Sequence, residues 1–223
     1  MKKLLLATVL LYMSLLSCQK ETSTLKQNST SGEQSLSRSN ANSYDHVVRN
    51  MGYNRGFMSP HGNYNMANVT ISFESTFPNL WYLEKFGNNY AKFWSQRRGT
   101  FDKWRVLDID WRNPQSDMST NVAIWTTNGD LNQEWELIGY NNTGALDSRN
   151  GFVGFIVNRY NGQMLEARTL IDNYSVNVVT AKQYKGSEEQ KAYEKDGNFG
   201  SVNLKYVWNI YRIPKDSPGY ARL

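Results

Sequence analysis

A tryptophan pair with a fixed internal spacing occurs twice in the middle of the chain. Trp94 is followed by Trp104, and Trp125 is followed by Trp135, so that each pair spans ten residues. Equal spacings indicate a duplicated supersecondary unit, because a repeat that buries apolar side chains against its neighbours keeps the same positions for them. The chain is therefore expected to fold from repeats of a few tens of residues.

Three copies of the unit can be aligned. The second is the fullest and runs through residues 107–109, 121–125 and 132–137. A degenerate first copy covers 81–107, and a third begins at 162–167 and closes at 206–210. The apolar runs in these copies are short or alternating and are bounded by Asn, Gly, Asp and Ser, which predicts strands and turns. No window shows a sustained amphipathic helix.

Trp104, Trp135 and Trp208 are each surrounded by residues that favour strands. A large aromatic side chain that recurs once per repeat is well suited to fill a shared core. We therefore expect these three tryptophans to be buried. Residues 191–205 interrupt the third copy before Trp208 and contain two glycines and mixed charges without an apolar period, so they are expected to form an insertion loop.

The second copy resembles the ricin-type lectin repeat in the order of its features. A strand carries Asp108, a later strand ends in the aromatic Trp125, and Gln133 begins a closing Gln-x-Trp. The resemblance covers about residues 69–214. It implies an all-β fold of the β-trefoil class, built from three pseudo-repeats.

The same resemblance implies a carbohydrate site made of Asp108, Trp125, Asn132 and Gln133. An aromatic face can stack on the C–H face of a sugar, and a carboxylate accepts strong hydrogen bonds from hydroxyls. Asn132 can both donate and accept, while Gln133 is expected to brace the loop. Ala123 departs from the family, which often has a polar residue there to support the aspartate. The alternative is that the motif serves folding, with Trp125 packed and Asp108 in a turn.

The other two copies are not expected to bind sugar. The first has Glu84 and Trp94 but lacks the Asn-Gln pair. The third has Glu166, and Thr180 stands where a stacking aromatic would be needed. The expected ligands are glycans, galactose-type sugars among them. One active repeat would bind weakly, and many copies on one surface would add avidity.

Features of an enzyme are sparse. His46 and His61 are the two histidines, and no nucleophile-elbow pattern accompanies them. Asp108 and Asp110 would face the same side of a strand, but nothing around them resembles a nucleotide-binding unit. An enzyme would need a cleft with paired carboxylates, for example Asp108 and Glu136. We therefore expect no catalysis, no cofactor and no metal.

The first residues predict export and lipidation. Lys2 and Lys3 precede an apolar run that is too short to span a bilayer, so residues 1–17 are expected to be a signal peptide. Cys18 ends a stretch that resembles a bacterial lipobox. It is the single cysteine of the chain, so it cannot form an internal disulfide, and we expect it to carry lipid. The chain would then be anchored to a membrane without spanning it.

Composition divides the rest of the chain. Residues 18–43 are rich in Ser, Thr, Asn and Gln and predict a flexible lipidated tether. Residues 44–223 are long enough for one domain. The net charge of +5 includes two leader lysines, and this modest excess does not indicate nucleic acid as a partner. Residues 19–21 resemble the short export tag of some surface lipoproteins, so the expected location is the outer membrane or cell surface.

A second resemblance is to the A subunit of cytolethal distending toxins, a lipidated ricin-like binding subunit. It rests on the lipobox, the aromatic cluster at 79–82 and the long insertion before the last tryptophan. The family's disulfide cysteines are absent. This alternative makes the chain a cell-binding or docking partner of a toxin or surface protein. Its exposed aromatic patch is expected to contain Trp81, Tyr82, Trp94 and Trp111.

Overall fold

Twelve β-strands follow one another along the described chain. The computed structural model describes residues 46–53, 56–62, 64–73, 80–87, 89–96, 105–115, 117–139, 151–172 and 175–212. These residues belong to one unit of the chain, Asn40–Leu223. The predicted signal peptide, Cys18, the tether and Trp104 lie outside them. The strands are β1 (His46–Asn50), β2 (Phe57–Pro60), β3 (Ala67–Ser72), β4 (Leu80–Phe86), β5 (Tyr90–Gln96), β6 (Arg105–Pro114), β7 (Thr120–Thr126), β8 (Trp135–Gly139), β9 (Phe152–Asn158), β10 (Gln163–Asp172), β11 (Ser175–Gln183) and β12 (Trp208–Arg212).

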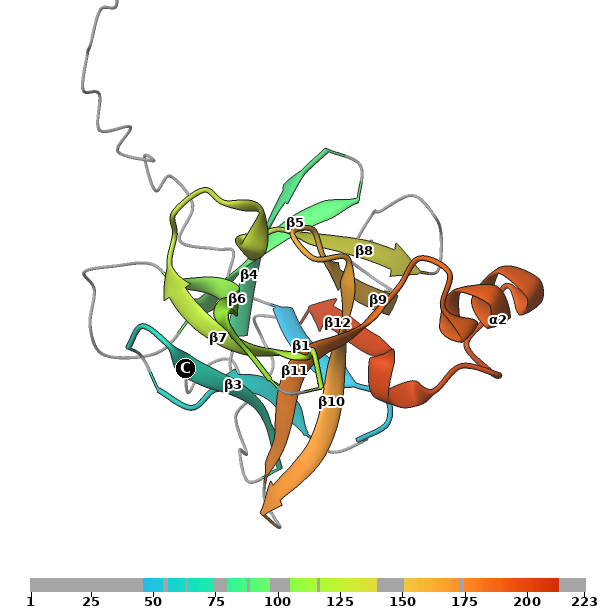
Figure 1. Ribbon diagram of the computed structural model, residues 1–223, viewed down its shortest axis with the longest axis horizontal. Helices are drawn as coiled ribbons and strands as arrows, with labels where there is room; N and C mark the ends of the chain where they lie inside the picture. Colours follow the sequence, from blue (N-terminus) through green and yellow to red (C-terminus); the bar gives the residue numbers. More distant parts are fainter. Residues whose placement is uncertain are drawn as a thin grey trace, which may run out of the picture. The chain divides into compact units, whose positions relative to one another are not determined.

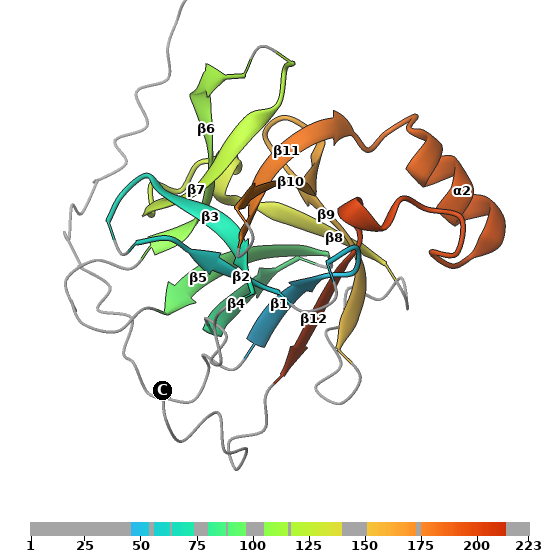
Figure 2. The ribbon, with the colours of Figure 1, turned by 90° about the horizontal axis from the view of Figure 1, so that it is seen from below.

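The strand pairings form two sets. β1, β4, β5, β8, β9 and β12 pair in that order, and β12 pairs back to β1, which closes a ring of six strands. The hairpins β2–β3, β6–β7 and β10–β11 form the second set, and β3, β7 and β11 also pair with one another. The arrangement around the ring can be followed in Figure 1 and, from a second direction, in Figure 2.

Each third of this architecture contains four consecutive strands: β1–β4, β5–β8 and β9–β12. The first and fourth strands of each third belong to the ring, and the second and third form its hairpin. The expectation of an all-β chain built from three repeats is confirmed, and the pairing is of the β-trefoil type. The ring leaves none of its six strands with an open edge, which protects it from pairing with other chains.

One buried tryptophan closes each repeat. Trp81, Trp135 and Trp208 are fully buried in the same core. Each indole Nε1 donates to a carbonyl oxygen of the second strand of its repeat: Trp81 to Met58 at 3.0 Å, Trp135 to Leu107 at 3.1 Å and Trp208 to Leu165 at 2.9 Å. These bonds satisfy the polar edge of a ring that otherwise contributes apolar surface to the core.

The prediction of the core tryptophans was correct for Trp135 and Trp208. In the first repeat the position belongs to Trp81, which the sequence had placed at the start of that repeat and in an exposed patch; both expectations were wrong. The first repeat begins instead at His46 on β1. Its strands lack the aspartate and the aromatic residue of the motif, so the sequence pattern gave no sign of where it begins.

The segment between β11 and β12 contains the helix α2 (Glu188–Asp196), where a loop without helix was expected. Ser187 caps the helix by accepting a bond from the backbone N–H of Gln190 at 3.0 Å, and Gly197 ends it with φ of +64°. Tyr193 of α2 stacks on Phe199, with ring centroids 4.7 Å apart. The helix is polar over most of its surface, so hydrophobic periodicity could not reveal it. No helix in the described part of the chain has the length and apolar character needed to cross a bilayer.

Candidate functional site

A pocket of about 170 Å³ opens in the second repeat, where β6, β7 and the loop before β8 meet. Asp108, Trp125 and Asn132 line it, as the sequence predicted for a shared site. The pocket also includes Met66, which comes from the first repeat. The structure thus brings three of the four predicted site residues to one surface and adds a neighbour that no local motif could indicate.

Asp108 lines the pocket and is only 6% exposed. Its Oδ1 accepts a hydrogen bond from Asn132 Nδ2 at 2.5 Å, and its Oδ2 accepts one from Gln133 Nε2 at 2.8 Å. Burial raises the pKa of Asp108 above its usual value, although the bonds from Gln133 and Asn132 favour the charged form and oppose the rise. Asp108 is therefore buried at the pocket, whereas Trp125 is half-buried.

Gln133 holds the loop that carries Asn132. Its Nε2 also donates to the carbonyl of Thr126 at 3.1 Å, and its Oε1 accepts the backbone N–H of Asn128 at 2.9 Å. The side chain is fully buried and does not line the pocket. Asn132 and Gln133 belong to the short 3-10 turn η1 (Leu131–Gln133), which directs both amides toward Asp108. Gln133 therefore occupies the bracing position that was expected of it.

Trp125 lies at the end of β7, half-buried, with its ring on the wall of the pocket. Met66 stands beside this strand end because its backbone N–H donates to the carbonyl of Ile124 at 2.9 Å. Asn65 strengthens the contact, since its Oδ1 accepts both the N–H and the hydroxyl of Thr126 at 3.0 Å. Met66 has φ of +66°, a conformation that costs a non-glycine residue free energy. The turn between β2 and β3 of the first repeat is thus held beside the site by the hydrogen bonds of Asn65 and Met66.

The four residues of β6 that follow Asp108 also line the pocket: Ile109, Asp110, Trp111 and Arg112. In a regular strand their side chains would alternate between the two faces. The pairing of β6 with β7 shifts register between Ile109 and Pro114, however, and such an irregularity breaks the alternation. The sequence suggested that Asp108 and Asp110 share a side, and both line the pocket. It could not show that Trp111 and Arg112 would join them.

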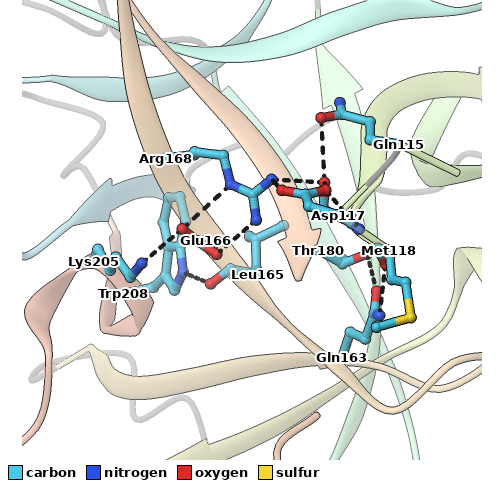
Figure 3. A network of polar contacts seen from close by, with 11 residues as sticks. Gln115, Asp117, Met118, Gln163, Leu165, Glu166, Arg168, Thr180, Lys205 and Trp208 are labelled. Carbon is cyan, nitrogen blue, oxygen red and sulfur yellow. Dashed lines mark hydrogen bonds and ion pairs between the residues drawn. The ribbon is translucent and has the colours of Figure 1, made fainter. Parts of the chain in front are cut away.

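The third repeat has an equivalent position that is filled by ion pairs. Leu165 accepts from Trp208 as Leu107 accepts from Trp135, so Glu166 corresponds to Asp108, and Lys205, three residues before Trp208, corresponds to Asn132. Lys205 Nζ lies 2.9 Å from Glu166 Oε1. Figure 3 shows this pair together with Arg168, which contacts the other carboxylate oxygen.

Arg168 extends this network to the hairpin turn of the second repeat. Its Nη2 lies 3.3 Å from Glu166 Oε2, and its Nη1 pairs with Asp117 and donates to Ser119 Oγ at 2.7 Å. Burial alone would lower the pKa of Lys205, but its hydrogen bond to Glu166 and the charge of that carboxylate raise it. Two cations therefore neutralise Glu166, whereas two neutral amides hold Asp108.

The stacking ring is also missing from the third repeat. Asp108 is paired with Ala123 and Glu166 with Val179, so Ala181 takes the place of Trp125. The register corrects the expectation that Thr180 would stand there, and it supports the expectation that this repeat has no aromatic platform.

In the first repeat, Ser59 follows Met58 where Asp108 follows Leu107, and Ser72 stands where Trp125 does. Glu84 and Trp94, expected as a degenerate site, lie instead on the β4–β5 hairpin, where Trp94 Nε1 donates to Glu84 Oε2 at 2.8 Å. Neither the first nor the third repeat thus reproduces the pair of carboxylate and aromatic ring.

Other predicted residues are dispersed. Tyr82 and Trp94 are half-buried, so Trp111 is the one exposed residue of the four that were expected to form an aromatic patch. Glu136 does not line the pocket with Asp108, and His46 lies on a ring strand. Among the described residues, no group of three His, Cys, Asp or Glu side chains could hold a metal ion.

The strand pairings describe an all-β protein whose arrangement resembles that of a β-trefoil. The chain matches no model of a known protein family and no curated protein. Among solved structures it is similar to the designed three-fold symmetric protein ThreeFoil, with 16% identity over 75% of this chain and 98% of that chain and a TM-score of 0.53. It is also similar to a mosquitocidal holotoxin, with 14% identity over 77% of this chain and 17% of that chain and a TM-score of 0.51. At such identities the similarity concerns the fold.

Proposed function

We propose that the protein is a non-catalytic carbohydrate-binding protein whose site is the pocket of the second repeat. One observation carries the proposal: the ring of Trp125 and the carboxylate of Asp108 share a pocket in which Asp108 is bonded to neutral amides. A sugar needs both an apolar surface for its C–H face and acceptors for its hydroxyls. The same position in the third repeat is neutralised by Lys205 and Arg168.

The hydrogen bonds of Asp108 leave room for a ligand. Each carboxylate oxygen has two acceptor directions, and the bonds from Asn132, Gln133 and the backbone N–H of Ile109 use three of the four. The remaining direction can accept from a sugar hydroxyl, and bonds to a charged acceptor are the stronger kind. Asn132 orients the carboxylate and lines the pocket itself. Asp110 adds a second acceptor to the same pocket.

We also propose that the protein works at the cell surface. Cleavage after residue 17, lipidation of Cys18 and the polar tether at 18–43 would hold the domain on the outer membrane. A single small pocket binds a sugar weakly, and galactose-type sugars are the first ligands to try. Many anchored copies would compensate through effective concentration.

A second candidate function is the docking of a toxin or surface partner. It is favoured by the exposed aromatic residues Trp111 and Tyr160, which contact each other beside the pocket. The similarity in fold to a segment of a mosquitocidal holotoxin is compatible with it. In this alternative the patch binds protein, and sugar has no part in the interaction.

A multivalent glycan array tests the proposal. The chain from residue 18 onward, with Cys18→Ser to prevent lipidation, is displayed beside its Trp125→Ala and Asp108→Ala variants. Leu204→Ala is the matched control, because Leu204 is an exposed apolar residue of the third repeat. We expect both site variants to lose binding and the control to keep it. If the wild-type protein binds no glycan, or if both variants bind as it does, the proposal is wrong.

A further inference from the structure

An aromatic corner borders the pocket on its outer side. Trp111 is 48% exposed and Tyr160 is 54% exposed, values that are high for such large rings. Their ring centroids lie 6.1 Å apart at an interplanar angle of 40°. Trp111 also lines the pocket, so the corner is continuous with the proposed site. Adjacent exposed rings of this kind mark a binding surface more often than isolated ones do.

The corner joins two repeats. Trp111 belongs to β6 of the second repeat, and Tyr160 lies in the turn between β9 and β10 of the third. The buried Asn158 fixes this turn, because its Oδ1 accepts the backbone N–H of Tyr160 at 3.0 Å. The Nδ2 of Asn158 donates to the carbonyl of Asn132 at 2.9 Å. One side chain thus connects the turn that carries Tyr160 to the loop that carries Asn132.

A cation completes the corner. The Cζ of Arg112 lies 5.5 Å from the centroid of the Trp111 ring, and Arg112 also lines the pocket. No carboxylate in the described part of the chain forms an ion pair with it at salt-bridge distance. Its five N–H donors can therefore bond to ring or hydroxyl oxygens of a ligand.

The pocket is smaller than most ligand pockets. Its volume of about 170 Å³ is below the ~300 to 1,000 Å³ that is usual for ligand pockets. It suits a single sugar unit, and any further unit of the same glycan must leave it over the rim. Trp111 lines the pocket and contacts Tyr160 of the third repeat, so a unit that leaves the pocket over Trp111 meets both rings.

We propose that the site continues onto an outer subsite formed by Trp111, Tyr160 and Arg112, which takes the second sugar unit of a glycan whose terminal unit occupies the pocket. This inference rests on the proposed carbohydrate-binding function. The two rings contact the C–H face of the second unit, and Arg112 donates to its oxygens. The preferred ligand is then an oligosaccharide, and the third repeat contributes to binding through Tyr160.

The test uses an array with matched series, in which each common hexose and N-acetylhexosamine is printed alone and as the terminal unit of disaccharides. The chain from residue 18 onward with Cys18→Ser is applied. For the best-bound terminal unit, we expect at least one disaccharide to bind about five- to tenfold more tightly than the monosaccharide, the gain typical of one aromatic contact. Tyr160→Ala should bring the ratio of disaccharide to monosaccharide affinity close to one, and Tyr160→Phe should preserve this ratio.

Saturation-transfer NMR on the same disaccharide provides a second readout. Protons of the second sugar unit should receive saturation from the wild-type protein and lose it with Tyr160→Ala. A ratio near one for every wild-type series, or a ratio that survives Tyr160→Ala, overturns the outer subsite while leaving the pocket intact. Absence of binding to any glycan overturns the proposed function, and the outer subsite fails with it.

Discussion

The second and third repeats share a backbone position for a buried carboxylate and differ in what surrounds it. Asp108 follows Leu107 and is held by the amides of Asn132 and Gln133. Glu166 follows Leu165 and is held by the cations of Lys205 and Arg168. Amide bonds orient a carboxylate and leave its charge in place, whereas ion pairs neutralise it. The same framework therefore supports an available acceptor in one repeat and a structural cross-link in the other.

The largest change in glycan affinity is expected when the second repeat is given a lysine at the position of Lys205 in the third repeat. In Asn132→Lys, an ammonium group would pair with Asp108 as Lys205 pairs with Glu166, and its side chain would occupy the pocket. We expect affinity for the array-identified glycan to fall by about a hundredfold, as loss of a charge-assisted interaction and steric exclusion act together. Leu131→Lys, one residue earlier and exposed, is the control in a calorimetric titration. Unchanged affinity in Asn132→Lys would contradict the equivalence of the two positions.

The next effect concerns stability in the third repeat. Lys205→Met removes one cation from Glu166, whose side chain is 3% exposed. Because Arg168 remains and Lys205 is 36% exposed, solvent screening reduces the cost to about 1 to 2 kcal/mol in the free energy of unfolding. Glycan affinity should not change. Urea unfolding monitored by tryptophan fluorescence measures the difference, and loss of sugar binding without loss of stability would contradict the division of roles.

The stability difference of Lys205→Met should depend on pH. The fold raises the pKa of Lys205 above its ordinary value of 10.5, so its contribution is complete below that value and is lost as the pH rises through the raised pKa. The difference between wild type and variant should therefore be constant near neutral pH and shrink above about pH 10.5. A difference that grows with pH in that range would show that the pair does not act as described.

A smaller effect is expected on the affinity of the second repeat at low pH. Sugar hydroxyls donate to the ionised form of Asp108, whose pKa burial raises above its ordinary value of 3.8. Affinity should be constant near neutral pH and fall, by up to about tenfold, as the pH drops through that raised pKa. Titrations between pH 7 and pH 4 measure this. Asp110→Asn should keep the fall in affinity but move it toward lower pH, because the charge of Asp110 contributes to the raised pKa of Asp108. A profile that is flat for the wild-type protein would exclude a role for the ionised carboxylate.

Ionisation of Asp108 also changes the free energy of unfolding. Since its pKa is raised in the fold, the contribution of Asp108 to the free energy of unfolding should be highest below the ordinary pKa and decrease as the pH rises through the folded value. Asp108 thus lowers stability when it is ionised, as expected for a group retained for binding. Glycan bonds to the carboxylate would offset that loss.

The smallest effect is expected from adding only the ring to the third repeat. Ala181→Trp places an aromatic residue at the position that corresponds to Trp125, beside a carboxylate that is already neutralised. Introduced into the Trp125→Ala background, it should change glycan binding by less than about twofold, because stacking alone supplies only part of the interaction. Recovery of binding in that double variant, measured on the same array, would show that the ion pairs of Glu166 do not prevent glycan binding by the third repeat.

The sequence indicated the second repeat better than the other parts of the molecule. Asp108, Trp125 and Asn132 lie within one local pattern, and short strands with a closing turn bring them together. The beginning of the first repeat was missed because Ser59 and Ser72 carry no motif. The helix α2 was missed because it is short and polar, and its caps were not distinguished from turn residues.

The rest of the candidate site depends on contacts between repeats. Met66 reaches the pocket through a backbone bond to Ile124, and Tyr160 through the bonds of Asn158. The shift of register in β6 turns Trp111 and Arg112 toward the same pocket. No local spacing encodes these features, since each arises when one repeat packs against the next.

The most direct test of the central claim is to locate the bound sugar by NMR. The protein from residue 18 onward is labelled with ¹⁵N and titrated with the best-bound glycan of the array, and the indole N–H signals of its tryptophans are followed. We expect shifts for Trp125 and Trp111 and none for Trp81 and Trp208. Shifts confined to the third repeat, with Trp125 unmoved, would contradict it.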